Sequence, residues 1–113
     1  MHEQSIVESL LSVVLKSAEQ NQAERIVTIN LVVGDLSGVV EDAVNFYFNF
    51  LARETIAAGA TINYRRVPVK MRCRDCRNVF EPEHLDLKCP ECSGRNLDII
   101  AGRELYVESL EVV

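Results

Sequence analysis

Four cysteines in two Cys-x2-Cys pairs constrain this chain more than any other feature of its sequence. The residues are Cys73, Cys76, Cys89 and Cys92, and twelve residues separate the pairs. Two residues between cysteines let both thiolates turn toward one ion, and two such turns supply four sulfurs at about 2.3 Å in a tetrahedral shell. The spacing resembles the paired hairpins of zinc-ribbon sites and predicts a segment that folds around a metal ion.

The first residues of the chain bear on whether these cysteines form disulfides or bind a metal. It reads Met1-His2-Glu3-Gln4, which is polar and acidic, whereas a signal peptide begins basic and then becomes apolar. We therefore expect a cytoplasmic protein. Because that compartment is reducing, structural disulfides are disfavoured and a metal site accounts for four cysteines better.

Composition excludes several classes of function. The 113 residues are 48% hydrophobic and 26% charged, which is ordinary for a globular protein. No apolar run approaches the roughly 18 residues that span a bilayer, so we expect no membrane partner. The net charge of −5 argues against a nucleic-acid partner, because non-specific binding depends on neutralising phosphates.

Two roles besides zinc binding remain open for the cysteines. A Cys-x2-Cys pair can be a redox dithiol, although two matched pairs disfavour it. A rubredoxin-like iron site is the second alternative, because tetrahedral sulfur suits both metals. Four sulfur ligands leave no open position for water, so the predicted zinc is structural rather than catalytic.

The residues around the cysteines form a weak repeat. Each pair is followed, two residues later, by a residue that tolerates the left-handed conformation, Asn78 and Gly94, which predicts backbone N–H groups turned toward the sulfurs. Five basic residues lie nearby and either offset the charge of the thiolates or form a solvated surface: Arg72, Arg74, Arg77, Lys88 and Arg95.

Apolar periodicity predicts two helices. Residues 4–22 carry apolar side chains at helical spacing, with Ser5 as N-cap and Glu8 reaching back to it, so Met1-His2-Glu3 would lie outside the helix. A second helix is expected over residues 41–58, ending before Gly59. Its predicted buried stripe is Ala43, Phe46, Tyr47, Phe50 and Leu51.

Three strands are expected over residues 25–33, 60–69 and 104–112. Between the last two, residues 71–101 are too poor in apolar side chains to form a hydrophobic core. We therefore predict an α+β fold in which two helices pack on a three-stranded mixed sheet, with an inserted zinc-ribbon-like domain. The domains would be residues 1–70 with 102–113, and residues 71–101.

The N-terminal arm offers a second set of metal ligands. The α-amino nitrogen of Met1, the backbone nitrogen of His2 and its imidazole can close two fused chelate rings, and Glu3 can add an oxygen. A nitrogen-rich planar set is what Ni(II) or Cu(II) prefers. A solvated terminal histidine with no metal is the simpler interpretation.

Taken together, these features resemble the HypA/HybF family of hydrogenase nickel-incorporation proteins. The resemblance covers essentially the full chain. It depends on Met1-His2-Glu3, on the loop from Val33 to Ser37, and on the two Cys-x2-Cys pairs. Met-His-Glu at the terminus is its most specific element.

The resemblance implies a cytoplasmic metallochaperone rather than an enzyme. Nickel would be bound by the amino terminus of Met1, by His2 and by Glu3, and zinc by the four cysteines. The protein would pass nickel, together with the GTPase HypB, to the precursor of the hydrogenase large subunit. The sequence leaves open whether the client is a hydrogenase or another nickel enzyme such as urease. Family members are described as self-associating, which also allows a homodimer.

This chain departs from some family members, which carry histidine beside a cysteine pair. Here Arg77 and Ser93 follow the pairs, and the other histidine, His84, is expected at the surface. The alternative function is a zinc-ribbon module that binds protein or nucleic acid. We expect no enzyme, because no nucleophile and base stand at a recognisable spacing.

Overall fold

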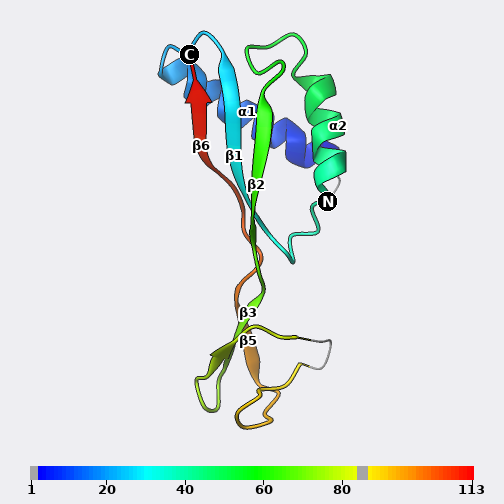
Figure 1. Cartoon of the computed structure of the whole chain (residues 1–113), viewed down its shortest axis with the longest axis vertical. Helices are drawn as coiled ribbons and strands as arrows, with labels where there is room; N and C mark the ends of the chain where they lie inside the picture. Colours follow the sequence, from blue (N-terminus) through cyan, green and yellow to red (C-terminus); the bar gives the residue numbers. More distant parts are fainter. Residues whose placement is uncertain (1–2, 84–86) are drawn as a thin grey trace. The chain divides into compact units, whose positions relative to one another are not determined.

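The computed structural model describes residues 3–83 and 87–113 (Figure 1). Along the chain its elements are α1 (Glu3–Gln20), β1 (Ile26–Gly34), α2 (Glu41–Leu51), β2 (Thr61–Val67), β3 (Lys70–Cys73), β4 (Val79–Phe80), β5 (Leu97–Ala101) and β6 (Leu105–Val112). Within these described residues, two helices and two three-stranded sheets form the α+β fold that the sequence predicts.

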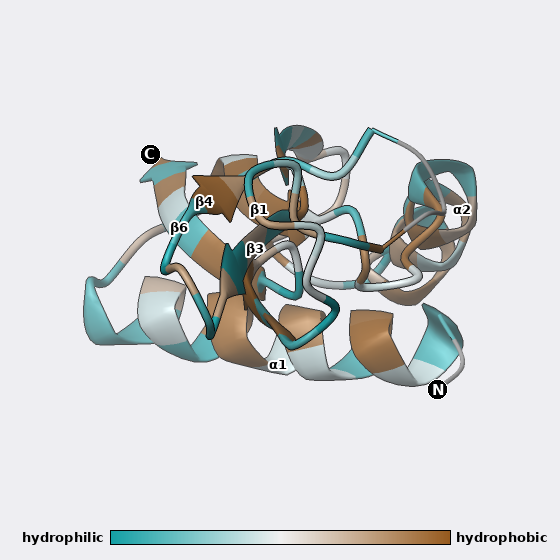
Figure 2. Cartoon of the chain, turned by 90° about the horizontal axis from the view of Figure 1, so that it is seen from below, coloured by the Kyte–Doolittle hydropathy of each residue, from teal (hydrophilic) through white to brown (hydrophobic). Residues whose placement is uncertain are grey.

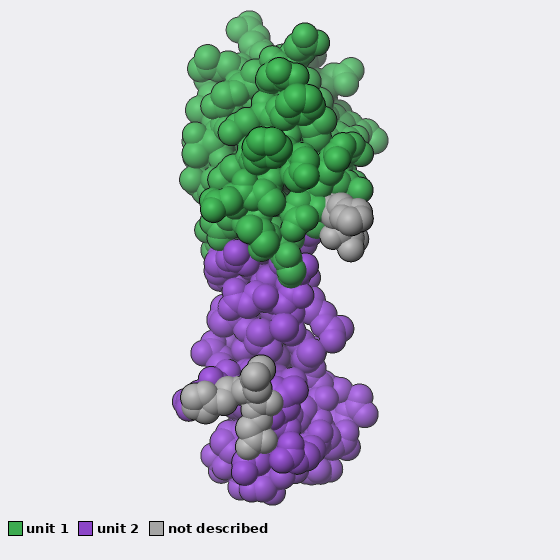
Figure 3. Space-filling model, turned by 90° about the vertical axis from the view of Figure 1, so that its right-hand side faces the viewer, with its two compact units in different colours: residues 1–32, 38–65, 106–113 green, residues 33–37, 66–105 purple. Residues whose placement is uncertain are grey.

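The chain divides into two compact units, coloured separately in Figure 3. Unit 1 comprises residues 1–32, 38–65 and 106–113, and unit 2 comprises residues 33–37 and 66–105. The domain limits expected at residues 70/71 and 101/102 stay a prediction.

Helix α1 buries one apolar face. Hydrophobic residues recur along it (Figure 2), and the buried ones are Val7, Leu10, Leu11, Val14 and Ala18, as the periodicity predicts. The predicted N-cap at Ser5 is wrong, because the helix already includes Glu3. Glu8 accepts a hydrogen bond from the side chain of Gln4 at 3.3 Å instead of capping the helix. Glu3 stands in the first turn, where the helix dipole favours a carboxylate.

The sheet of unit 1 has the order β2-β1-β6. Strands β1 and β2 run in the same direction, because the first residue of β1 bonds to the segment that leads into β2, and the residue that follows β1 bonds to the last residue of β2. The N–H of Ile26 donates to the carbonyl of Ile56 at 2.9 Å, and the N–H of Asp35 donates to that of Val67 at 2.9 Å. Helix α2 supplies the crossover that a parallel pair requires.

Strand β6 runs antiparallel to β1, which makes the sheet mixed, as predicted. Arg25 and Val113 exchange backbone hydrogen bonds of 3.3 and 2.9 Å at one end of the pair, and Gly34 donates to Glu104 at 2.6 Å at the other. Across the three strands, Asn63 donates to Asn30 at 3.1 Å, and Asn30 donates to Ser109 at 3.0 Å.

Helix α2 differs from the prediction in length and in its buried face. It ends at Leu51 rather than near residue 58, because Thr55 bonds locally: its hydroxyl donates to Ala52 at 2.8 Å and accepts from the N–H of Ala57 at 3.1 Å. The buried helical residues are Val44 and Phe48, so the stripe expected from Phe46 and Phe50 is wrong. These two phenylalanines are 68% and 55% exposed.

In unit 2, β3 pairs with β4 and with β5, both antiparallel, in the order β4-β3-β5. The register of β3 and β5 shifts between Lys70 and Met71. Met71, Cys73 and Cys89 are buried here, which agrees with the prediction that this segment has little hydrophobic core of its own.

Candidate metal centre

The structure brings the four cysteines of unit 2 together. Cys73 is the last residue of β3, Cys76 lies in the turn that follows, and Cys89 and Cys92 lie in the connection from β4 to β5. Their sulfurs all lie within 4.8 Å of one another. All four cysteines are free thiols.

The separations between the sulfurs suit a tetrahedral ion. Cys73 Sγ lies 3.5 Å from Cys92 Sγ, and Cys76 Sγ lies 3.5 Å from Cys89 Sγ. Four sulfurs at about 2.3 Å from one tetrahedral ion would be about 3.8 Å apart. A disulfide would need sulfurs at about 2.05 Å. The donor set therefore fits a metal such as zinc.

The two Cys-x2-Cys turns are built alike. In the first, the N–H of Arg77 donates to the carbonyl of Cys73 at 2.8 Å; in the second, Ser93 donates to Cys89 at 2.8 Å. The left-handed residues are Arg77, with φ 65°, and Ser93, with φ 62°. The expectation that Asn78 and Gly94 would be left-handed is wrong by one residue, because the chain must reverse directly after the second cysteine of each pair.

Asn78 and Gly94 nevertheless occupy equivalent places. The carbonyl of Asn78 accepts from the N–H of Cys73 at 2.9 Å, and that of Gly94 accepts from the N–H of Cys89 at 2.8 Å. Their own N–H groups donate to the sulfurs of Cys76 and Cys92. The predicted approach of backbone N–H groups to sulfur is therefore present.

The thiols ionise unequally. Burial opposes ionisation of Cys89, but hydrogen bonds from the N–H groups of Cys92 and Glu91 lower its pKa to about 6. The N–H of Asn78 favours the thiolate of Cys76, yet the neighbouring sulfurs and burial together raise that pKa to about 12. Adjacent sulfurs cannot all carry charge without a cation, so a bound dication would remove this conflict.

Arg74, one of the five nearby basic residues, has a carboxylate partner. It donates to Asp98 on β5 through Nε at 2.8 Å and through a terminal nitrogen at 2.6 Å. The hydrogen bond from Arg74 lowers the pKa of Asp98. The carboxylate of Asp98 therefore balances the charge of Arg74, and no interaction of Arg74 with the thiolates is needed.

The side chain of Asn78 is a further contact that the sequence did not predict. Its amide lies 3.9 Å from Cys89 Sγ. The spacing of the cysteines singled out position 78 only for its backbone, and no local signal marks a side chain that reaches the other pair.

The predicted nickel ligands lie at the other end of the sequence. Met1 and His2 fall outside the described residues, as does His84, whose predicted surface position therefore stays a prediction. Glu3 is half-buried in the first turn of α1.

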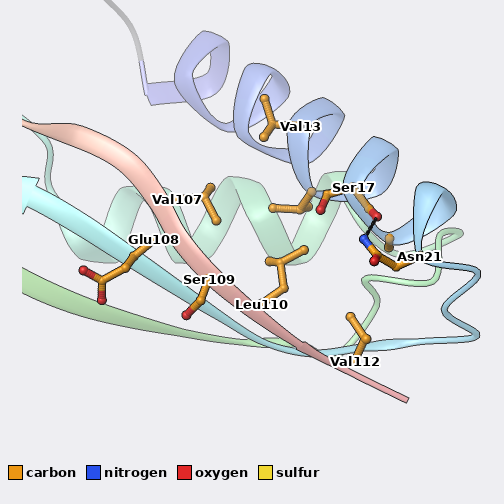
Figure 4. Close-up of a pocket in the computed structure, with 10 residues that line it drawn as sticks. Val13, Ser17, Asn21, Val107, Glu108, Ser109, Leu110 and Val112 are labelled. Atoms are coloured by element: carbon orange, nitrogen blue, oxygen red, sulfur yellow. Dashed lines mark hydrogen bonds between the residues drawn. The ribbon is translucent and has the colours of Figure 1, made fainter.

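Unit 1 also contains a groove of about 400 Å³ between α1 and β6 (Figure 4). Its apolar lining includes Val13 of α1 and Val107, Leu110 and Val112 of β6. No helix in the described part of the chain is long and apolar enough to cross a membrane.

Comparison with known proteins points to the same family that these residues resemble. A family model described as "Hydrogenase/urease nickel incorporation, metallochaperone, hypA" matches residues 1–112. The hydrogenase maturation factor HypA of Dehalococcoides mccartyi (strain CBDB1) is 46% identical over 112 residues, covering 99% of this chain and 94% of the relative. The hydrogenase maturation factor HybF of Escherichia coli O157:H7 is 36% identical over 112 residues, covering 99% of each chain.

Solved structures agree with the sequence relatives. The solution structure of the Ni metallochaperone HypA from Helicobacter pylori matches with a TM-score of 0.70 and 30% identity, covering 100% of this chain and 98% of that one. A second solution structure, of a HypA protein, matches with a TM-score of 0.78 and 30% identity, covering 100% and 97%. The chain therefore belongs to the HypA family of nickel-incorporation metallochaperones, which act in hydrogenase maturation and are not enzymes.

Proposed function

We propose that this chain binds Ni(II) at its N-terminus and delivers it to the large subunit of a [NiFe]-hydrogenase. Membership of a nickel-incorporation family carries the proposal. The chemistry of the first three residues supports it. Met1 offers its α-amino group, His2 its backbone nitrogen and imidazole, and Glu3 a carboxylate.

Each nitrogen donor must lose its proton before it binds the metal. The α-amino group has an ordinary pKa of about 7.7–8.0 and imidazole one of about 6.5. Nickel affinity should therefore fall as the pH drops below about 7. A site made from the end of the chain loses few contacts when the ion leaves, which suits transfer to another protein.

The four cysteines are proposed to hold a structural zinc ion. Their sulfurs lie close enough to share one ion, and four thiolates would fill a tetrahedral shell. Zinc would supply folding free energy to unit 2 rather than take part in nickel chemistry.

The proposed partners are those of nickel delivery: a HypB-type GTPase and the precursor of the hydrogenase large subunit. Transfer is measured as radioactive nickel that appears in the purified precursor with and without the GTPase. A homodimer and a cytoplasmic location complete the proposal. Light scattering of the zinc-loaded chain tests the dimer.

The first experiment is elemental analysis of the untagged protein followed by nickel titration. We expect about one zinc per chain and one added nickel. His2→Ala should lose nickel and keep zinc, because only the imidazole is removed. A tag of several residues fused before Met1 should act in the same way, because it converts the α-amino nitrogen of Met1 into an amide.

His84→Ala is the matched control, since it removes the other histidine of the chain. It should bind nickel as the unaltered protein does. Unchanged nickel affinity in both His2→Ala and the N-terminal fusion would refute the site at the amino terminus.

A further inference from the structure

Asn78 contacts three of the four cysteines. Its carbonyl oxygen accepts from the backbone N–H of Cys73 at 2.9 Å, and its own N–H donates to the sulfur of Cys76. Both contacts lie within the first Cys-x2-Cys turn. Its side-chain Nδ2 instead reaches across to the second turn and donates to Cys89 Sγ at 3.9 Å. One residue therefore joins both cysteine pairs.

The equivalent position in the second turn cannot make the reciprocal contact. Gly94 repeats both backbone contacts but has no side chain. A Cβ atom at Gly94 would lie 2.9 Å from Asp75 Oδ2 and 3.2 Å from Cys92 Sγ, so there is little room for an amide there. Of the two equivalent positions 78 and 94, position 78 is therefore the one whose side chain can donate a hydrogen bond to the other turn.

We propose that Asn78 is a positioning residue of the metal centre, whose amide ties the two cysteine pairs together and slows both loss of zinc and its replacement by nickel. The inference rests on the proposed zinc and nickel functions. Asn78 contributes no ligand atom of its own, so it acts through Cys89.

Charge and geometry give the amide this role. Four thiolates and one dication carry a formal charge of −2, and each N–H donor aimed at sulfur offsets part of it. Metal loss requires a thiolate to swing away from the ion. Cys73 and Cys89 are buried, whereas Cys76 and Cys92 are exposed. The amide donates to buried Cys89, so it keeps that ligand in place while an exposed thiolate detaches and rebinds.

The same contact bears on metal selection. Zinc accepts a tetrahedral set of sulfurs without electronic cost, whereas Ni(II) favours planar or tetragonal sets. To flatten the shell, the two turns would have to rotate relative to each other. A hydrogen bond between the turns resists that rotation, which keeps the protein from trapping its nickel at the cysteines.

The test compares zinc-loaded full-length chains carrying Asn78→Ala, Asn78→Asp or Asn96→Ala. Asparagine to aspartate keeps the shape of the side chain but removes its N–H donors. Asn96 is an exposed asparagine of the same unit, and its alanine variant is the matched control. Position 78 is not left-handed, so alanine fits its backbone.

Two rates are measured: transfer of zinc to the dye 4-(2-pyridylazo)resorcinol, and growth of the nickel–thiolate charge-transfer absorption after addition of excess nickel sulfate. Loss of a group that orients a metal ligand typically costs about 10- to 100-fold in affinity. We expect both Asn78 variants to lose zinc and to take up nickel at the cysteines at least about tenfold faster than the parent. Asn96→Ala should match the parent.

Rates in both variants equal to those of Asn96→Ala would overturn the inference. Rates of zinc loss and nickel uptake equal to the parent's in Asn78→Asp alone would also overturn it. They would show that the volume of the Asn78 side chain, rather than its N–H donors, slows metal exchange. If the variants fail to retain zinc while circular dichroism shows the helices of unit 1 intact, the inference is supported. A parent chain that binds no zinc would instead refute the proposed zinc site.

Discussion

The backbone carbonyl of Gly102 occupies the space that a side chain at Gly34 would need. A Cβ atom at position 34 would overlap that carbonyl and lie 2.7 Å from the backbone nitrogen of Arg103. Gly34 donates to Glu104 at 2.6 Å, and Leu36 donates to Gly102 at 2.7 Å. Residues 34–36 and 102–104 of unit 2 therefore lie so close together that their backbones are in direct contact.

Gly34→Ala should be among the most destabilising single changes in the chain. Ordinary overpacking costs about 1–3 kcal/mol, and here the backbone itself must move, so we expect at least the upper end of that range. Urea unfolding measures it. The control is Gly59→Ala, which meets open space and bears only the strain of φ 77°, about 1–2 kcal/mol. A smaller loss for Gly34→Ala than for this control would contradict the prediction.

Phe48→Ala and Phe46→Ala should differ sharply although the two residues are close in sequence. Phe48 is 1% exposed, so its truncation should cost about 3–5 kcal/mol. Phe46 is 68% exposed and makes an edge contact with Tyr47, so its loss should cost less than about 1 kcal/mol. Thermal unfolding distinguishes them. Equal losses would show that α2 packs with a different face.

Asn63, Asn30 and Ser109 form a row of hydrogen-bonded side chains across the sheet of unit 1, and Asn30→Ala removes the central one. It breaks the bonds to Asn63 and to Ser109, and each such bond contributes about 0.5–1.5 kcal/mol. We expect a loss of about 1–2 kcal/mol. Ser109→Ala breaks one of the two bonds and should cost about half as much. An Asn30 variant as stable as the parent would mean that water replaces both bonds fully.

Proton release on zinc binding should depend on pH in a defined direction. The pKa of Cys76 is raised to about 12 and that of Cys92 is also raised, so both are protonated thiols at about pH 7 and would release protons to the proposed zinc ion. The pKa of Cys89 is lowered to about 6, so it is largely ionised at about pH 7 and protonated at about pH 5. The number of protons released should therefore increase as the pH falls through this range, and apparent affinity should decrease.

Calorimetry in buffers of different protonation enthalpy counts these protons. A Cys89→Ser variant serves as the control, since the step between about pH 7 and pH 5 should diminish with it. A proton count that is constant over this range in the parent would contradict the assigned order of ionisation.

The order of the helices and long strands was predictable because each has strong periodicity. The buried face of α1 follows from residues at helical spacing such as Val7 and Val14. The mixed sheet follows from a helix between its first two strands. The cysteine cluster was predictable because ligand spacing is a local property of sequence.

The features of α2 and of Asn78 that the sequence did not predict have physical explanations. Phe46, Phe48 and Phe50 leave α2 apolar on more than one side, so hydrophobicity alone could not select Phe48 as the buried one. The end of α2 depends on hydrogen bonds of Thr55 that periodicity does not register. The amide of Asn78 acts on a cysteine eleven residues away, and only the folded chain brings the two together.

Both cysteine turns reverse direction through residues that carry a side chain, Arg77 and Ser93, rather than through glycine. A left-handed residue of this kind costs about 1–2 kcal/mol, and binding of the proposed zinc ion would offset part of the cost of these two angles. Metal affinity can therefore be tuned at positions that supply no ligand. Glycine at position 77 or 93 would relieve the strain and make the metal harder to remove.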